Sequence, residues 1–152
     1  MAREIIFTEN APKAVGPYVQ AVRSNGMVYV SGQLGIDTAA GGLADGVEAQ
    51  AHCSMKNLGA ILRQAGTDYT KIVKTTIFLT DMNDFAAVNK IYESYFGGDF
   101  PARSCVQVAQ AAAWRSGRSR VHCTTVIIMK GLWVFRALFL DADRLGWLCY
   151  FI

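Results

Sequence analysis

The stretch VQAVRSNGMVYVS, residues 19–31, decides how the first part of the chain folds. Its two ends, residues 19–23 and 27–31, are rich in β-branched and apolar residues that favour strands. Between them, Asn25 and Gly26 form the dipeptide that most readily adopts the positive φ angles of a tight hairpin turn. The stretch therefore predicts an antiparallel β-hairpin.

Two amphipathic helices are expected further along the chain. Apolar residues recur at helical spacing over residues 46–65, and Asp45 with Glu48 resembles the capping box that opens a helix. Asp84 is expected to open the second helix. The apolar stripe of that helix consists of Phe85, Val88, Tyr92 and Tyr95.

The remaining strands complete the predicted fold. Short apolar and β-branched runs predict strands over residues 5–8, 72–80, 102–108 and 121–129. In chain order the elements are then β, β-hairpin, α, β, α, β, β. This order favours an α+β fold in which two helices pack on one face of a mixed β-sheet.

The composition is that of one folded domain. The chain has 152 residues, 52% of them hydrophobic and 18% charged, which excludes intrinsic disorder, and its formal net charge is only +3. The sequence shows no secretory leader and no run of about 18 uninterrupted apolar residues, so we expect a soluble intracellular protein. The expected compartment is the cytoplasm, with the mitochondrial matrix as the alternative.

The four cysteines argue against a disulfide framework and against a metal site. They are widely spaced and form no C-x-x-C pair, as expected of free thiols in a reducing compartment. Two of them directly follow a histidine, at His52-Cys53 and His122-Cys123. Adjacent side chains diverge on a helix and on a strand, so neither pair is suited to bind one metal ion.

The composition changes after Gln110. Residues 111–152 carry six Lys and Arg residues against two Asp residues, a net charge of +4, which leaves −1 for the rest of the chain. All three tryptophans lie in this part, and no Asp or Glu occurs between Asp99 and Asp141. Such a change is typical of an appended module, or of a C-terminus whose origin differs from that of the body, such as a shifted reading frame or an altered splice.

Six short motifs occur in a fixed order within residues 4–109. They are Glu9-Asn10-Ala11-Pro12, Gly16-Pro17-Tyr18, Ser31-Gly32-Gln33, Lys74-Thr75-Thr76, Asn83-Asp84-Phe85 with Val88-Asn89, and Phe100-Pro101-Ala102-Arg103-Ser104-Cys105. Together they resemble the RidA/YjgF family of reactive-intermediate deaminases. Residues 123–127 are similar to the end of that family's last strand.

The resemblance implies a fold, an assembly and an activity. The fold is chorismate-mutase-like, and three copies form a homotrimer with an active site in each cleft between subunits. The activity is hydrolysis of 2-iminobutanoate, 2-iminopropanoate and related enamines, which are reactive intermediates of amino-acid metabolism, to 2-oxo acids and ammonia. The resemblance implies no metal and no organic cofactor, and we expect neither a membrane nor a nucleic acid as partner.

The same resemblance implies which residues form the site. Arg103 is expected to be catalytic and to bind substrate, because its guanidinium can hold the substrate carboxylate by two hydrogen bonds. Cys105 is expected to help hold the attacking water through its backbone carbonyl and not through its thiol. The other pocket residues that the resemblance implies are Tyr18, Ser31, Gly32 and Asn89. Without the resemblance, surface and packing roles explain these residues as well.

The sequence departs from the family at the last strand. Family members carry a Glu-Ile-Glu-like pair there, and one of the two carboxylates is thought to activate the water. In this chain Arg120 and His122, or Arg118 in an alignment without a gap, occupy the matching positions. Loss of a positioned general base costs about 10²–10⁴ in rate, so we expect weak or lost activity unless His122 serves as the base.

Two other functions stay open on the sequence. A non-catalytic trimeric module for small carboxylates would keep Arg103 without turnover. An RNA-binding or ribonucleolytic translation inhibitor would use the aromatic and basic stretch from Trp114 to Arg120. Residues 1–129 are expected to form the RidA-like domain, and residues 130–152 a hydrophobic C-terminal extension that is either an amphipathic helix or poorly ordered.

Overall fold

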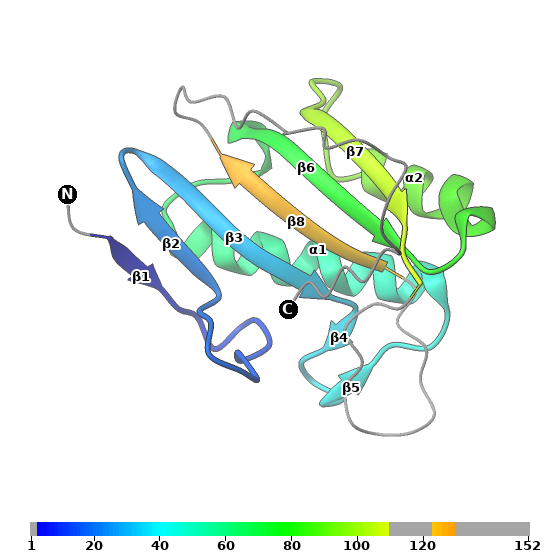
Figure 1. The fold of residues 1–152 in the computed structure, drawn as a ribbon, viewed down its shortest axis with the longest axis horizontal. Helices are drawn as coiled ribbons and strands as arrows, with labels where there is room; N and C mark the ends of the chain where they lie inside the picture. The colour runs from blue at the N-terminus through cyan, green and yellow to red at the C-terminus, as the bar shows by residue number, and fades with distance from the viewer. Residues whose placement is uncertain (1–2, 110–122, 130–152) are drawn as a thin grey trace, which may run out of the picture.

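Six strands form one mixed β-sheet in the order β1-β2-β3-β8-β6-β7 (Figure 1). The structure is a computed structural model that describes residues 3–109 and 123–129. Neighbouring strands are antiparallel except β6 and β7, which are parallel. The strands are β1 (Glu4–Ile6), β2 (Ala21–Ser24), β3 (Met27–Leu34), β6 (Ile72–Leu79), β7 (Ala102–Gln107) and β8 (Cys123–Met129).

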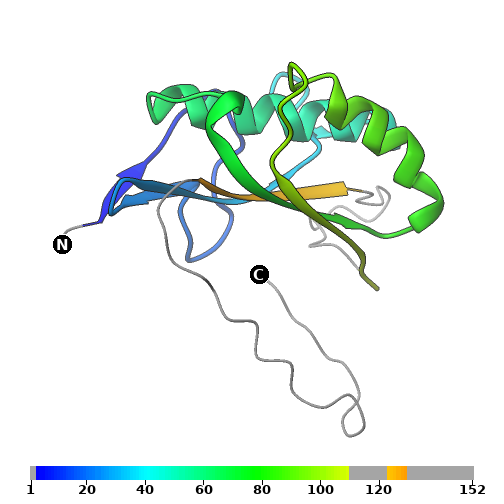
Figure 2. The same ribbon diagram turned by 90° about the horizontal axis from the view of Figure 1, so that it is seen from above.

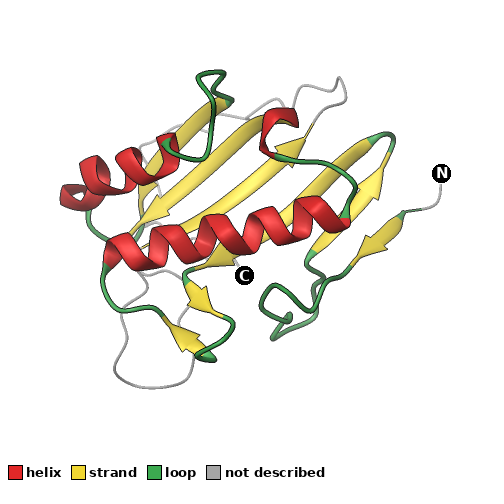
Figure 3. Ribbon diagram, turned by 180° about the vertical axis from the view of Figure 1, so that it is seen from behind, coloured by secondary structure: helices red, strands yellow, loops and turns green. Residues whose placement is uncertain are grey.

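Two helices cover one face of this sheet (Figures 2 and 3). Helix α1 spans Val47–Gln64 and helix α2 spans Phe85–Glu93. Short 3-10 turns, Tyr69–Lys71 and Met82–Asp84, precede β6 and α2. The predicted α+β arrangement, with both helices on one face of a mixed sheet, is confirmed.

The predicted hairpin of β2 and β3 is also confirmed. Asn25 and Gly26 have φ angles of 53° and 74°, the positive values that the turn requires. β3 continues to Leu34, with a register shift against β8 between Val30 and Gln33. Such a bulge bends a strand, so β3 bends at Ser31 and Gly32, two of the expected site residues.

Helix α2 connects the two parallel strands. β6, α2 and β7 form a β-α-β unit, the kind of connection that parallel neighbours require. The register pairs Thr75 with Arg103 and Ile77 with Cys105. Side chains alternate along a strand, so Arg103 and Cys105 share the face that α2 covers, while Ser104 lies on the opposite face.

The hydrophobic core lies between the sheet and α1. Leu58, Ile61 and Leu62 of the helix, together with Ile77 and Leu79 of β6, are at most 2% exposed. Each such side chain contributes about 1.5–3 kcal/mol when it is buried. The helical spacing of apolar residues in the sequence therefore identified the buried face of α1 correctly.

Buried polar side chains of α1 hold the end of β3. The Ser54 hydroxyl donates to the Gln33 carbonyl at 2.8 Å. The Asn57 amide donates to the carbonyls of Leu34 at 3.2 Å and Ile36 at 2.9 Å. Buried amide and hydroxyl groups are costly unless they are paired, so these bonds fix the path of the chain just after the bulge.

The first helix starts differently from the prediction. Gly46, with a φ angle of 79°, is the N-cap of α1, and no side chain caps that helix. The capping box of Asp45 and Glu48 is therefore wrong, because glycine at a positive φ angle starts the helix one residue later. The second helix begins at Phe85 with Asp84 as its N-cap residue, as predicted, and a 3-10 turn capped by the Asp81 carboxylate precedes it.

A small second sheet has no counterpart in the prediction. It consists of β4 (Ile36–Asp37) and β5 (Gly42–Leu43). Strands of two residues are too short to show a hydrophobic period. The turn between them is held by the Asp37 carboxylate, which accepts from the backbone amide of Ala39 at 2.8 Å.

Some predictions fall outside the described residues. The predicted strand over 121–129 is confirmed for residues 123–129, and the predicted tail over 130–152 lies outside. Within the described ranges, no helix is long and apolar enough to cross a membrane.

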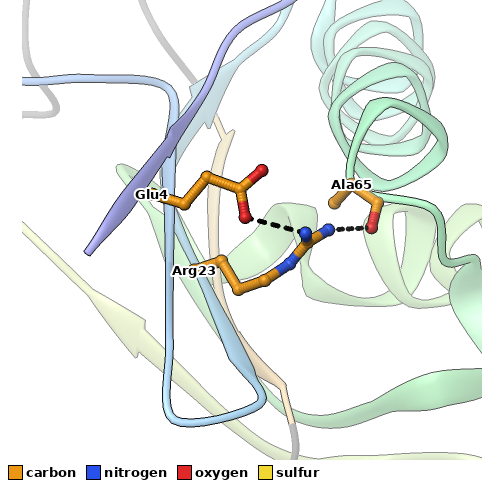
Figure 4. A network of polar contacts seen from close by, with 3 residues as sticks. All are labelled: Glu4, Arg23 and Ala65. Carbon is orange, nitrogen blue, oxygen red and sulfur yellow. Dashed lines mark hydrogen bonds and ion pairs between the residues drawn. The ribbon is translucent and has the colours of Figure 1, made fainter. Parts of the chain in front are cut away.

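Arg23 links the first two strands to the end of α1 (Figure 4). Its guanidinium donates to the Glu4 carboxylate at 2.8 Å and to the Ala65 backbone carbonyl at 2.5 Å. Glu4 lies opposite Arg23 in the register of β1 and β2. Ala65 is the C-cap of α1, where a cation also interacts favourably with the helix dipole.

We expect Arg23→Met to lower the free energy of unfolding by about 1–2 kcal/mol, because a helix-terminal carbonyl loses its charged donor. Glu4→Gln should lower it by less than about 0.5 kcal/mol, because exposed ion pairs contribute little. Urea denaturation of both variants measures the difference. Equal losses would contradict the dominant role of the bond to Ala65.

Candidate active site

Arg103 projects from β7 toward α2 and is half-buried. Its Nη1 donates to the side-chain oxygen of Asn89 at 2.7 Å. The guanidinium carbon lies 5.0 Å from the ring centroid of Tyr92 and 5.5 Å from that of Phe85, both within the range of cation–π contacts. The structure thus brings together two of the residues expected at the site, Arg103 and Asn89.

The guanidinium of Arg103 keeps donors for a ligand. It has five N–H donors, and Asn89 accepts from one of them. Among the described residues, the ion pair that the structure contains joins Arg23 to Glu4. Arg103 has no carboxylate partner among these residues. A half-buried guanidinium of this kind suits a planar carboxylate that accepts two parallel hydrogen bonds.

Cys105 lies two residues beyond Arg103 on the same face of β7 and is half-buried. Burial raises the pKa of its thiol, and the nearby Arg103 only partly offsets this effect. The thiol is therefore protonated at neutral pH and is a poor nucleophile. A role for the Cys105 backbone carbonyl needs no thiolate. We call Arg103, Asn89 and Cys105 the arginine half-site.

The other expected residues lie around the loop that precedes β2. Tyr18 and Gly32 line a cavity of about 30 Å³, together with Pro12, Lys13 and Val15 of the loop and the end of β3. A second cavity, of about 210 Å³, extends to β1 and shares Tyr18 with the first. Neither cavity is lined by a residue of β7 or α2. We call Tyr18, Ser31 and Gly32 the loop half-site.

The sheet register gives the separation of the two half-sites. Gln33 of β3 pairs with Thr125 of β8, which pairs with Ile77 of β6, which in turn pairs with Cys105 of β7. Three interstrand steps of about 4.8 Å place β3 roughly 14 Å from β7 at this level. Within one copy of the chain, the two half-sites therefore lie apart.

Ser31 uses its polar groups to hold the loop. Its hydroxyl donates to the Val19 carbonyl at 2.6 Å, and its backbone amide donates to the Gln20 carbonyl at 2.9 Å. The hydroxyl proton is thus committed to the protein, and the oxygen can still accept a hydrogen bond from a ligand.

Gln20 organises the same loop from inside the protein. It is 3% exposed, and its side-chain oxygen accepts from the backbone amide of Thr8 at 2.7 Å. Its amide nitrogen donates to the carbonyls of Thr8 at 3.0 Å, Ala11 at 3.2 Å and Pro12 at 2.9 Å. The buried Gln20 side chain therefore fixes the position of the backbone that leads to Tyr18.

We expect Gln20→Met, which keeps most of the side-chain volume, to lower the free energy of unfolding by about 2–3 kcal/mol, because several backbone groups lose their partner. Gln64→Met on the exposed end of α1 is the matched control and should change it by less than about 0.5 kcal/mol. Thermal or urea unfolding tests both. A Gln20 variant as stable as the control would show that the loop holds its path without these bonds.

Gln20 and Tyr92 are the residues that sequence reasoning missed. Nothing in the sequence marks Gln20 as buried, because it stands in an ordinary half-buried strand pattern. Tyr92 was assigned only to the apolar stripe of the second helix. A signal was present, however: Phe85, Asn89 and Tyr92 are spaced i, i+4, i+7 and so share one face of α2.

Comparison with known proteins decides the family. A model of the Endoribonuclease L-PSP family matches residues 8–115. The chain belongs to this RidA/YjgF family. A RidA/YjgF relative from Mus musculus, named 2-iminobutanoate/2-iminopropanoate deaminase, is 51% identical over 125 residues, which cover 82% of this chain and 91% of that protein. A protein of the same name from Salmonella typhimurium is 52% identical over 108 residues, 69% of this chain and 84% of that protein.

Solved structures of the RidA/YjgF family share the fold. The crystal structure described as E. coli TdcF with bound serine has a TM-score of 0.75 and 39% sequence identity. It covers 83% of this chain and 97% of that chain. The residues expected to distinguish this RidA/YjgF member at the last strand are Arg118, Arg120 and His122. They lie outside the described residues, as does the basic stretch from Trp114 to Arg120.

Proposed function

We propose that this protein is an imine/enamine deaminase, a hydrolase that converts 2-iminobutanoate or 2-iminopropanoate to the 2-oxo acid and ammonia. Identity of about 50% to curated deaminases of that name supports the reaction class. The observation that carries the proposal is the environment of the Arg103 side chain. It is half-buried, held by Asn89 and Tyr92, and has no carboxylate partner among the described residues.

The reaction adds one water to a C=N bond and releases ammonia. Arg103 binds the substrate carboxylate and so fixes the neighbouring imine carbon. A water held at the Cys105 carbonyl attacks that carbon. The C–O bond forms while the C=N π electrons move to nitrogen, which takes up the proton that the water loses. The resulting carbinolamine loses ammonia as its hydroxyl proton is transferred, leaving the 2-oxo acid. Positioning of this kind lowers a barrier by several kcal/mol.

The assembly we propose is a homotrimer of the chorismate-mutase-like type. Each site would join the arginine half-site of one subunit to the loop half-site of the next. The face of the sheet opposite the helices supports association, because Ile5, Tyr29 and Val106 lie on it by the strand register and are 54%, 44% and 41% exposed. Sedimentation equilibrium should give the mass of three chains, and a monomer would contradict the shared site.

A non-catalytic carboxylate-binding module is the second candidate function. One observation favours it: no Asp or Glu occurs between Asp99 and Asp141, where the family's last strand carries its carboxylates. Such a module would bind 2-oxo acids through Arg103 and would not accelerate imine hydrolysis.

The domain division and compartment are also proposals. Residues 1–129 would form the deaminase-like domain, because the family match and the sheet both fall within this range. Residues 130–152 would form an extension. Cys53 and Cys105 are free thiols, which supports a reducing compartment such as the cytoplasm.

A coupled assay separates the two candidate functions. Threonine dehydratase generates 2-iminobutanoate, and semicarbazide competes with hydrolysis by trapping the imine. A deaminase reduces the semicarbazone formed, in proportion to its concentration. Semicarbazone formation that does not change with added protein, together with binding of 2-oxobutanoate, would favour the binding module.

A further inference from the structure

Arg103 rests on one face of α2. Phe85, Asn89 and Tyr92 are spaced i, i+4, i+7 along this helix, and all three contact the guanidinium. They are not equivalent, because Phe85 is 38% exposed whereas Tyr92 is 5% exposed. Tyr92 is therefore the more firmly held of the two aromatic rings that contact the guanidinium. It lies beneath the edge strand β7, which carries Arg103.

Tyr92 is itself held in place. Its hydroxyl lies 2.9 Å from the Thr75 hydroxyl. Thr75 is fully buried on β6 and is the register partner of Arg103 on β7. The Tyr92 ring contacts the Arg103 guanidinium, the Tyr92 hydroxyl contacts the Thr75 hydroxyl, and Thr75 is the strand partner of Arg103. Together these contacts leave the Tyr92 ring little freedom to rotate.

The Tyr92 side chain also stays neutral. Burial raises the pKa of its phenol, although the bond to Thr75 and the charge of Arg103 act in the opposite direction. A phenolate in this place would compete with the substrate carboxylate for Arg103. The neutral ring instead presents its negative face to the cation and leaves the remaining N–H donors to a ligand.

We propose that Tyr92 is the positioning residue for Arg103, holding the guanidinium in the orientation that binds the carboxylate of 2-imino and 2-oxo acids. This inference rests on the proposed function for its ligand class. A long, flexible arginine loses affinity when it must be ordered at the moment of binding, and a preformed orientation removes that loss.

The test measures binding of 2-oxobutanoate to the full chain by calorimetry. Tyr92→Leu should weaken the Kd about tenfold, the effect of losing one partly buried cation–π contact. Tyr92→Phe keeps the ring and should change the Kd by less than about threefold. Tyr92→Met, which adapts to the same space, replaces the leucine variant if that variant does not fold.

Tyr95→Leu is the matched control. Tyr95 follows Tyr92 by three residues and packs in a tilted arrangement against Tyr69, at 5.5 Å between ring centroids, instead of against Arg103. Both leucine variants lose a packed aromatic ring, so both should be less stable. Only the Tyr92 variant should lose affinity and broaden the Nε–Hε NMR signal of Arg103.

Unchanged Kd values in the Tyr92→Leu and Tyr92→Met variants would overturn the inference, as would an equal loss of affinity in Tyr95→Leu. Absence of 2-oxobutanoate binding by the unsubstituted protein would overturn it as well. A protein that binds 2-oxobutanoate in a Tyr92-dependent way but does not hydrolyse the imine would contradict the proposed deaminase activity and leave the positioning role intact.

Discussion

Arg103→Ala is expected to lower kcat/KM for imine hydrolysis, and the affinity for 2-oxobutanoate, by at least about 100-fold, because two charge-assisted hydrogen bonds to the carboxylate are lost. The surrounding residues cannot replace the charge, since Asn89, Phe85 and Tyr92 are all neutral. Arg103→Lys keeps the charge but loses the planar fork, and should recover only part of the loss. The coupled semicarbazide assay and calorimetry measure the two effects.

Lys56→Ala is the control for the loss of one positive charge. Lys56 lies on the exposed side of α1, away from both Arg103 and the sheet face proposed for association. We expect its removal to change kcat/KM by less than about threefold. Equal effects of the two substitutions would mean that general electrostatic attraction, and not a bound carboxylate at Arg103, governs activity.

Replacement of residues 110–122 by a family strand that carries Glu-Ile-Glu is expected to raise kcat by about 10²–10⁴, the usual contribution of a positioned general acid or base. The native stretch contains no Asp or Glu, and its three arginines also place positive charge in the segment that precedes β8. The same assay compares the native and the replaced protein.

The control for this replacement carries Gln-Ile-Gln in the same strand. If only the glutamate version gains activity, the carboxylate is the cause. If the glutamine version gains as much, the effect comes from the repaired strand itself. Equal turnover by the native protein and the glutamate version would show that the carboxylate is dispensable in this chain.

Local patterns predicted most of the fold. The hairpin follows from Asn25 and Gly26 alone, and the buried face of α1 follows from its apolar spacing. The position of β8 between β3 and β6 does not follow from any local pattern, because it depends on pairing between segments far apart in the chain. The capping box at Asp45 failed for a local reason: Gly46 adopts a backbone conformation that takes over the helix start.

The sequence predicted a set of site residues but not their arrangement. Motif order pointed to Arg103 and Asn89, and the structure places them in contact. It also separates Tyr18 from Arg103 within one copy of the chain, which no sequence pattern reports. The support from Tyr92 depends on how α2 lies over β7, so it becomes visible only in the folded chain.

The claim that each site is built from two subunits has a direct test in a subunit-mixing experiment. The two chains are Arg103→Ala and Tyr18→Ala, each with little activity alone. They are unfolded together in equal amounts and refolded. The parent is the native protein or the Glu-Ile-Glu version, whichever turns over faster. Random assembly of trimers leaves about one quarter of the sites with an intact Arg103 and an intact Tyr18 loop on adjoining subunits. We predict recovery of about a quarter of the parent's imine-hydrolysis rate. A mixture no more active than its two components would contradict a site shared between subunits.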